Sequence, residues 1–302
     1  MSHEANSLKA IFFALGANGA IAAAKLFAAF YTGSSAMLAE AIHSLADCGN
    51  QGLLLIGIDR AKKPPTPDHP LGFGKAVYFW SFIVALMLFS LGGMFSIYEG
   101  YHKLDSHEGL HMPWLAVGIL AFSVAMESVS LWGCMTEINK ARGQKNLWRW
   151  FRETRQSELI VVLGEDLAAL AGLSMALAAV LLTIFTGNPI FDAAGSIAIG
   201  LLLVFVAVVV GWEIQSLLIG QSVEPEVRKA ICDFLGAREE VVHVFNTLTL
   251  QMGEDVMLAV KAEMREASSP AHLIRDINRC EEALRAEFPK LRWIFFEPDN
   301  HD

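Results

Sequence analysis

Three ionisable residues share one face of an otherwise apolar stretch of the sequence. Glu40, His43 and Asp47 are spaced i, i+3 and i+7, which places them within about 60° of one another around a helix. An imidazole and carboxylate oxygens that converge on one point are the ligands that a divalent first-row metal ion requires. His43 and Asp47 lie one helical turn apart and can reach the same ion. Glu40 lies a further turn away and is better placed at the entrance to the site, or as a residue that supports the ligands without binding the ion. The spacing therefore predicts a metal site.

A second pair of acids lies in a later apolar stretch. Glu165 and Asp166 are adjacent, and adjacent residues of a helix point about 100° apart. The two carboxylates therefore cannot address one ion equally: if one faces the first cluster, the other faces a neighbouring helix or a cavity wall. Ionisable side chains are costly in a bilayer core, so we interpret both clusters as functional. The alternative is a hydrogen-bonded network that holds the helices together.

Other polar residues also lie in apolar stretches. Glu127 is interpreted either as a proton relay or as a polar clamp between helices. Asn50 lies on the helical face of Asp47 and, like Gln51, can hydrogen-bond across helices. We therefore expect Asn50 to support the ligands or to relay protons. Lys25 is expected to pair with an acid or to extend toward the membrane interface.

The composition indicates which elements position these residues. Of the 302 residues, 54% are hydrophobic and 18% are charged, whereas a soluble chain carries roughly 25% charged residues. The mean hydropathy is +0.41. These values exclude a disordered chain and a basic nucleic-acid binder, and the net charge of −9 argues against polyanion partners.

Six stretches are long enough to cross a bilayer: residues 8–30, 36–58, 76–100, 113–136, 159–185 and 190–217. The sequence therefore predicts an all-α, six-helix transmembrane bundle over residues 1–220.

Basic residues in the loops predict the orientation of this bundle. Four lysines or arginines follow the second stretch and six follow the fourth, whereas the connections on the opposite side hold only Lys103. Because cytoplasmic loops are enriched in basic residues, both termini are expected in the cytoplasm. The first stretch is too long for the apolar part of a cleavable signal peptide, and this favours a bacterial inner (plasma) membrane.

Residues 221–302 form a separate, polar segment. Residues 222–302 hold 26 charged residues, 10 basic and 16 acidic. Their pattern predicts the order α-β-β-α-β, with elements at Glu226–Leu235, Thr247–Met252, Val256–Met264, Ala271–Phe288 and Leu291–Phe296. This order is typical of a small α+β domain with helices on one face of its sheet, which we expect in the cytoplasm and at a dimer interface. The four cysteines lie far apart and predict no disulfide framework.

The pattern of the second stretch resembles a known signature. The sequence Gly33-Ser34-x-x-x-Leu38-Ala39-Glu40-Ala41-x-His43-Ser44-x-x-Asp47 is similar to the second helix of the cation diffusion facilitators, and the loop His69-Pro-x-Gly72-x-Gly74-Lys75 is similar to one of theirs. The Glu-Asp pair and Glu40-x-x-His43 resemble the subfamily of the mitochondrial and nuclear-associated zinc transporter. The resemblance implies homodimers that export Zn²⁺ or related divalent ions in exchange for protons. The metal is then a transported substrate, and no cofactor is expected.

The resemblance also implies which residues hold the ion. Three of the family's four transport ligands are matched by His43, Asp47 and Asp166. The fourth position is Val162, which cannot coordinate a metal. We therefore expect Glu165, Glu40 or water to complete the coordination.

The C-terminal segment departs from the family pattern as well. Some relatives bind regulatory zinc there, but the matching positions here are Phe245, Lys261 and Phe295. We therefore expect this domain to dimerise without a full binuclear zinc site.

Together these observations predict a transporter and not an enzyme. A divalent cation, most simply Zn²⁺, is expected to cross by alternating access and to leave when protons compete for its ligands. A coordination shell completed by water would instead admit Mn²⁺, Co²⁺ or Fe²⁺. The expected partners are the ion, protons, the lipid bilayer and a second copy of the chain, without nucleic acid.

One alternative is a non-transporting membrane protein whose C-terminal domain binds partners. An intramembrane hydrolase is disfavoured, because the sequence lacks His-Glu-x-x-His and a nucleophile constellation.

Overall fold

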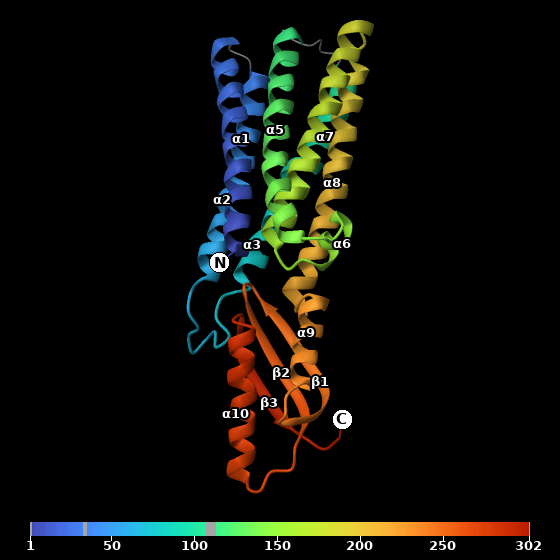
Figure 1. Cartoon of the computed structure of the whole chain (residues 1–302). Coiled ribbons are helices and arrows are strands. Elements are labelled where there is room, and N and C mark those ends of the chain that lie inside the picture. The colour runs from blue at the N-terminus through green and yellow to red at the C-terminus, as the bar shows by residue number, and fades with distance from the viewer. Residues whose placement is uncertain (1, 33–34, 107–112, 302) are drawn as a thin grey trace. The chain divides into compact units, whose positions relative to one another are not determined.

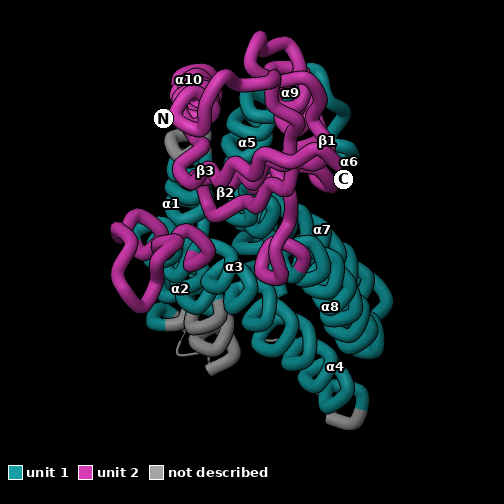
Figure 2. The backbone as a smooth tube through the Cα atoms, turned by 90° about the horizontal axis from the view of Figure 1, so that it is seen from below, with its two compact units in different colours: residues 1–59, 77–150, 156–215 teal, residues 60–76, 151–155, 216–302 magenta. Residues whose placement is uncertain are grey.

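The chain folds as two compact units (Figure 2). The computed structural model describes residues 2–32, 35–106 and 113–301, without the side chains of residues 2–6, 29, 32, 35–40, 42, 43, 105 and 106. What we call the helical unit comprises residues 1–59, 77–150 and 156–215. The sheet unit comprises residues 60–76, 151–155 and 216–302. Two segments that connect helices thus belong to the sheet unit.

The helical unit is built from helices, most of them long, although the end of α6 belongs to the sheet unit (Figure 1). They are α1 (Ser2–Thr32), α2 (Ser35–Ala61), α3 (Ala76–Met87), η1 (Leu88–Met94), α4 (Phe95–Ser106), α5 (Pro113–Arg142), α6 (Leu147–Glu153), α7 (Ser157–Thr186) and α8 (Ile190–Ile219). The π-helix η1 joins α3 to α4 without a break, so these three segments form one membrane-crossing run.

Five helical runs in the described part of the chain are long and apolar enough to cross a membrane. They are Ser7–Ala28, Ala76–Leu104, Pro113–Arg142, Ser157–Thr186 and Ile190–Ile219. The sixth predicted span coincides with α2, whose 27 residues suffice to cross a bilayer. Helix α2 is not among the five, and much of its first half lies outside the described side chains. The predicted class, a helical membrane bundle followed by a small α+β domain, is confirmed.

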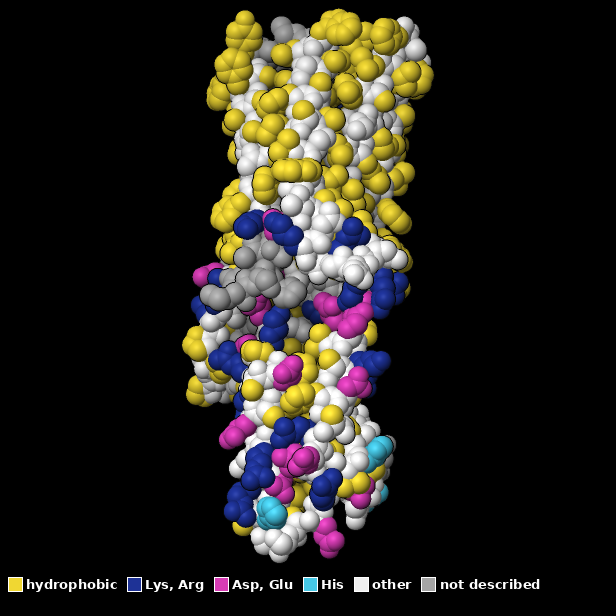
Figure 3. All heavy atoms as spheres, in the orientation of Figure 1, with side chains coloured by type: hydrophobic (Ala, Val, Ile, Leu, Met, Phe, Trp, Pro, Cys, Tyr) yellow, Lys and Arg dark blue, Asp and Glu magenta, His cyan; other side chains and the backbone are white. Residues whose placement is uncertain are grey.

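The helical unit presents apolar side chains outward and buries polar ones. Hydrophobic side chains cover its visible face in Figure 3, and large residues such as Phe27, Trp132 and Phe205 are at least 66% exposed. Helix α5 shows the reverse on its inner side, where the buried residues are mostly small or polar: Ser123, Glu127, Ser130, Gly133, Cys134, Glu137 and Ile138. This arrangement suits a bundle surrounded by lipid, in which polar groups must be satisfied internally.

Close packing holds α5 between α1 and α7 (Figure 1). A Cβ atom at Gly133 would overlap the ring of Phe13, so the glycine lets α1 and α5 approach closely. Ser7 Oγ on α1 donates to Glu158 Oε1 on α7 at 2.7 Å. Buried hydrogen bonds between spans are a recurrent way of joining membrane helices.

The sheet unit contains the predicted α+β fold. Its elements are α9 (Pro225–Gly236), β1 (Val241–Met252), β2 (Asp255–Met264), α10 (Pro270–Glu287) and β3 (Leu291–Pro298). The strand order is β1-β2-β3, with β1 antiparallel and β3 parallel to β2. The α-β-β-α-β order is therefore confirmed.

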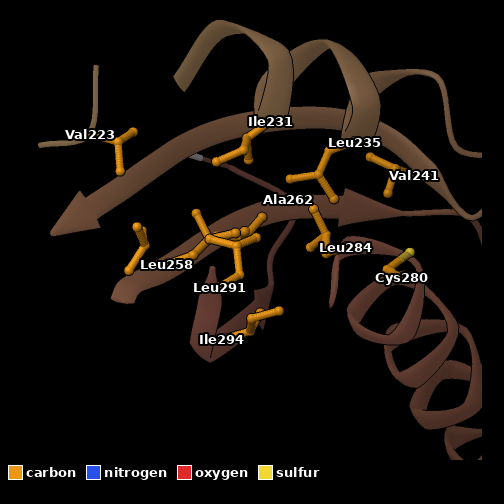
Figure 4. Close-up of a cluster of buried hydrophobic side chains, with 12 residues drawn as sticks. Val223, Ile231, Leu235, Val241, Leu258, Ala262, Cys280, Leu284, Leu291 and Ile294 are labelled. Carbon is orange, nitrogen blue, oxygen red and sulfur yellow. The ribbon is translucent and has the colours of Figure 1, made fainter. Parts of the chain in front are cut away.

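One hydrophobic core lies beneath a single face of this sheet (Figure 4). Alternate residues of β2, including Leu258 and Ala262, are buried, as period-two side-chain geometry requires. Ile231 of α9 and Leu284 of α10 enter the same cluster. Both helices therefore cover the same face of the sheet.

Strand β1 begins earlier than its sequence pattern predicts. The alternation is regular only from Thr247, but the strand starts at Val241. Its register with β2 shifts between Val241 and His243 and again between Val244 and Asn246. Such irregularities interrupt the inside–outside alternation on which the prediction depends.

The loop before α3 touches the β1–β2 hairpin within the sheet unit. A Cβ atom at Gly74 would overlap the Met252 carbonyl oxygen, and Gly253 adopts a positive φ of 72° at the turn. We predict that Gly74→Ala destabilises this contact by about 1–3 kcal/mol, the usual cost of overpacking. Faster amide hydrogen exchange in peptides from 60–76 and 241–264 is the expected readout. Gly236→Ala is the control, because its Cβ would meet nothing within 4 Å; unchanged exchange in Gly74→Ala would contradict the prediction.

Candidate cation site

Helix α2 carries the first predicted cluster. Glu40 and His43 lie on this helix, but their side chains are outside the described part of the structure. Asp47 is partly buried. It lies within electrostatic range of Glu165 on α7 and of Glu127 on α5. The structure thus places Asp47 among acids that are distant in the sequence.

The carboxylate of Glu165 on α7 faces α2. The Glu165 side chain is buried, and its Oε1 accepts a hydrogen bond from Asn50 Nδ2 at 3.1 Å. Its Oε2 accepts a hydrogen bond from Gln51 Nε2 at 2.6 Å. Both carboxylate oxygens are therefore held by side-chain amides of the helix that carries Asp47.

The neighbouring carboxylate, that of Asp166, faces α5 instead. Asp166 is 2% exposed, and its Oδ1 accepts a hydrogen bond from Ser130 Oγ at 3.0 Å. The two adjacent acids thus contact different helices, as their angular separation of about 100° predicts. Asp166 also lies within electrostatic range of Glu127, which is 4% exposed on α5. Helices α2, α5 and α7 therefore each contribute acids to one buried group.

Positive charge reaches this group from α1. Lys25 is 6% exposed and interacts electrostatically with Glu127. The expectation that Lys25 pairs with an acid agrees with this placement. The region around this ammonium contains four described carboxylates, those of Asp47, Glu127, Glu165 and Asp166. An excess of carboxylates in a low-dielectric interior favours a bound cation or bound protons.

Three carboxylate and amide oxygens of the described residues in this region are buried without a hydrogen-bond partner. They are Asp166 Oδ2, Asn50 Oδ1 and Gln51 Oε1. A buried polar atom without a partner costs about 1–3 kcal/mol, and such atoms in native proteins commonly mark a bound ion or water. Carboxylate and amide oxygens are also ligands for divalent cations. The residues present therefore fit a cation site.

Two contributors were not predicted as members of the site. Gln51 was expected only to hydrogen-bond across helices, and Ser130 was not singled out. Ser123, Glu127, Ser130, Cys134 and Glu137 recur every three or four residues, which marks one face of α5. That spacing was the available sequence signal for Ser130. Val162 is fully buried in the apolar packing of α7.

In the sheet unit, Lys261 occupies one of the positions at which relatives were expected to bind zinc. Its ammonium lies 3.1 Å from Asp299 Oδ2, and this hydrogen bond holds the pKa of the Asp299 carboxyl below its usual range. A lysine thus neutralises the carboxylate at this point of the domain.

The fold, the buried acids and a family model together define the class of protein. The model of the cation efflux transmembrane domain matches residues 11–219. The chain therefore belongs to the cation diffusion facilitator family, whose members are multi-pass membrane transporters of metal cations.

Among three of its relatives, the chain is more similar in sequence to a zinc antiporter than to a bacterial cation-efflux pump. The chain is 35% identical over 247 residues to the proton-coupled zinc antiporter SLC30A9, mitochondrial, of Xenopus laevis, covering 81% of this chain and 44% of that protein. It is 32% identical over 240 residues to metal tolerance protein C4 of Arabidopsis thaliana, covering 77% and 51%. It is 27% identical over 268 residues to the cation-efflux pump FieF of Escherichia coli, covering 88% and 83%. The matched region thus spans less than half of the frog antiporter.

Proposed function

We propose that this protein exports Zn²⁺ across a membrane in exchange for protons, by alternating access. The observation that carries the proposal is the set of carboxylates from α2, α5 and α7, which includes the buried and unpartnered Asp166 Oδ2. The similarity to proton-coupled zinc antiporters supports the ion and the coupling. Mn²⁺, Co²⁺ and Fe²⁺ are the alternative cargoes for the same oxygen-rich site.

In this proposal His43, Asp47 and Asp166 bind the cation directly. These groups must lose their protons before they coordinate a metal, so metal binding releases protons and a lower pH weakens it. The imidazole is the natural exchanger, because histidine titrates near neutral pH. Release on the far side then follows when protons reoccupy the ligands.

Orientation and assembly are part of the same proposal. We place both termini in the cytoplasm, on the grounds of the basic loops after α2 and α5. We place the protein in a bacterial inner membrane as a homodimer, with residues 221–302 contributing to the dimer. Selective labelling of single-cysteine variants from either side of the membrane tests the orientation, and crosslinking in membranes tests the dimer.

The test of transport is a metal-panel assay in proteoliposomes. Purified protein is reconstituted with an internal metal indicator and a pH gradient, and Zn²⁺, Mn²⁺, Co²⁺ and Fe²⁺ are added in turn. We expect uptake of Zn²⁺ that increases with the opposing proton gradient and collapses when an ionophore removes that gradient. Zn²⁺ uptake that does not depend on the proton gradient would contradict proton exchange.

A second function is favoured by one specific set of contacts. The Asn50–Glu165, Gln51–Glu165 and Ser130–Asp166 hydrogen bonds join three helices, as they would in a membrane protein that does not transport and whose polar core is only structural. Such a protein would show no metal uptake with any member of the panel, although it would be folded and correctly inserted.

Glu127 offers a test of the proton route. Its carboxyl is buried on the polar face of α5, and Ser123 Oγ one turn away is unpartnered. We predict that Glu127→Gln lowers the proton flux by about 100-fold, the lower end of the usual contribution of a proton-transfer group, while metal affinity changes by less than about threefold. Proton release and metal binding are measured on the same sample, with Glu99→Gln as the control because Glu99 is 43% exposed and paired with Lys103. A loss of folding without a selective loss of proton flux would instead favour the helix-clamp role.

A further inference from the structure

We propose that the amide oxygens of Asn50 and Gln51 are ligands of the transported cation, and that Glu165 is a positioning residue that orients both amides. This inference rests on the proposed function, which it deepens by assigning ligands and a basis for ion selectivity. It also replaces the expectation that Glu165 itself completes the coordination.

Each of the two amides has a donor nitrogen and an acceptor oxygen. Both oxygens of the Glu165 carboxylate accept hydrogen bonds from these amide nitrogens. Glu165 therefore orients the amide of Asn50 through Nδ2 and that of Gln51 through Nε2, at 3.1 and 2.6 Å. In a planar amide the oxygen lies on the other branch from the nitrogen. Both carbonyl oxygens are consequently turned away from Glu165.

The two amide carbonyl oxygens are buried. Asn50 is 4% exposed and Gln51 is fully buried, yet neither carbonyl oxygen has a hydrogen-bond partner. If the amides served only to clamp α2 to α7, each would leave a desolvated acceptor at a cost of about 1–3 kcal/mol. A cation that accepts both oxygens removes this cost. The clamp alone thus explains the nitrogens but not the oxygens.

Both amides follow Asp47 closely along α2. Asn50 and Gln51 are three and four residues after Asp47, and such residues are neighbours on a helix surface. Asp47 is in turn within electrostatic range of Glu165. Although adjacent helical residues point about 100° apart, both amides reach the same Glu165 carboxylate, so they lie together near Asp47. Asp166 Oδ2 adds a further unpartnered oxygen from α7.

The consequence is a site richer in oxygen than a tetrahedral zinc centre. Carbonyl and carboxylate oxygens suit harder cations such as Mn²⁺, whereas imidazole suits Zn²⁺, Fe²⁺ and Cu²⁺. The amides would therefore broaden the range of accepted ions toward Mn²⁺. Removing them should narrow this range toward Zn²⁺ without abolishing transport, because the charged ligands remain.

The experiment compares metal binding and transport by Asn50→Leu and Gln51→Met in the full-length protein. We expect each change to lower Mn²⁺ affinity by about tenfold or more, the usual scale for residues that tune a metal site, and Zn²⁺ affinity by less than about threefold. Leu54→Met is the control, because it places the same methionine on α2 at a fully buried position three residues further on. Equal losses for both metals, or none, would overturn the selectivity role.

A double-mutant cycle separates positioning from direct ligation by Glu165. If Glu165 acts only through the amides, Glu165→Gln lowers Mn²⁺ affinity in the wild-type background but has no further effect in the Asn50→Leu/Gln51→Met background. A full additional loss in that background would show that Glu165 binds the ion itself and would overturn its positioning role.

A spectroscopic measurement on the unaltered protein tests the inference even if the variants fail to fold. Co²⁺ bound by His43, Asp47, Asp166 and two amide oxygens is five-coordinate and should give weak visible absorption, whereas a tetrahedral centre gives intense bands. Intense bands would overturn the inference and leave the proposed function intact. A wild-type protein that neither binds nor transports any metal of the panel would overturn both.

Discussion

Replacing Asp47 with alanine should abolish metal-stimulated proton flux in proteoliposomes while the protein still folds. The change removes a negative charge and a ligand at a point where α2 faces Glu165 and Glu127. A residue that only supports metal ligands typically contributes 10- to 100-fold, so we expect a ligand to contribute more than about 100-fold. Proton flux is measured with an internal pH dye after Zn²⁺ is added outside.

Asp59 supplies the matched control for this experiment. It is an acid on the same helix α2, but its side chain is exposed and lies three turns from Asp47. Asp59→Ala should therefore transport like the wild type. Normal flux in Asp47→Ala would remove Asp47 from the cation site and leave the carboxylate group as a structural feature.

Asp166→Asn should produce the second large effect. Asparagine keeps the size of the side chain and an oxygen that can still accept the Ser130 hydrogen bond, but it removes the charge. We expect metal affinity to fall by more than about 100-fold, for the same reason as at Asp47. We also expect the fall of affinity at low pH to become shallower, because one fewer acid releases a proton on binding. Calorimetric titration with Zn²⁺ at several pH values measures both quantities.

Ser130→Ala provides a graded comparison for Asp166. This change leaves both Asp166 oxygens in place and removes one hydrogen bond that orients them. The affinity should therefore fall by roughly 10-fold, the lower end of the range for supporting residues. If Ser130→Ala were as damaging as Asp166→Asn, or if Asp166→Asn retained wild-type affinity, Asp166 would hold α5 and α7 together rather than bind the ion.

The fold was largely predictable. The lipid bilayer requires a minimum length of apolar residues in each span, and the sheet requires a period of two in each strand. Long apolar stretches located the membrane helices, and Leu258 with its alternate neighbours located β2. The start of β1 was not predictable, since the register shifts near His243 break the alternation. Nor does any local pattern indicate that Gly74 must lie against Met252, more than 170 residues away.

The amino-acid sequence alone determined the membrane class, the order of elements and the set of buried acids, because hydropathy and helical spacing are local properties. It also determined that Glu165 and Asp166 could not face the same way. Only the tertiary structure decided which helix each acid faces: Glu165 contacts Asn50 and Gln51 of α2, and Asp166 contacts Ser130 of α5. Such pairings depend on the rotation of each helix about its axis, which is set by packing against all its neighbours at once and leaves no local trace in the chain.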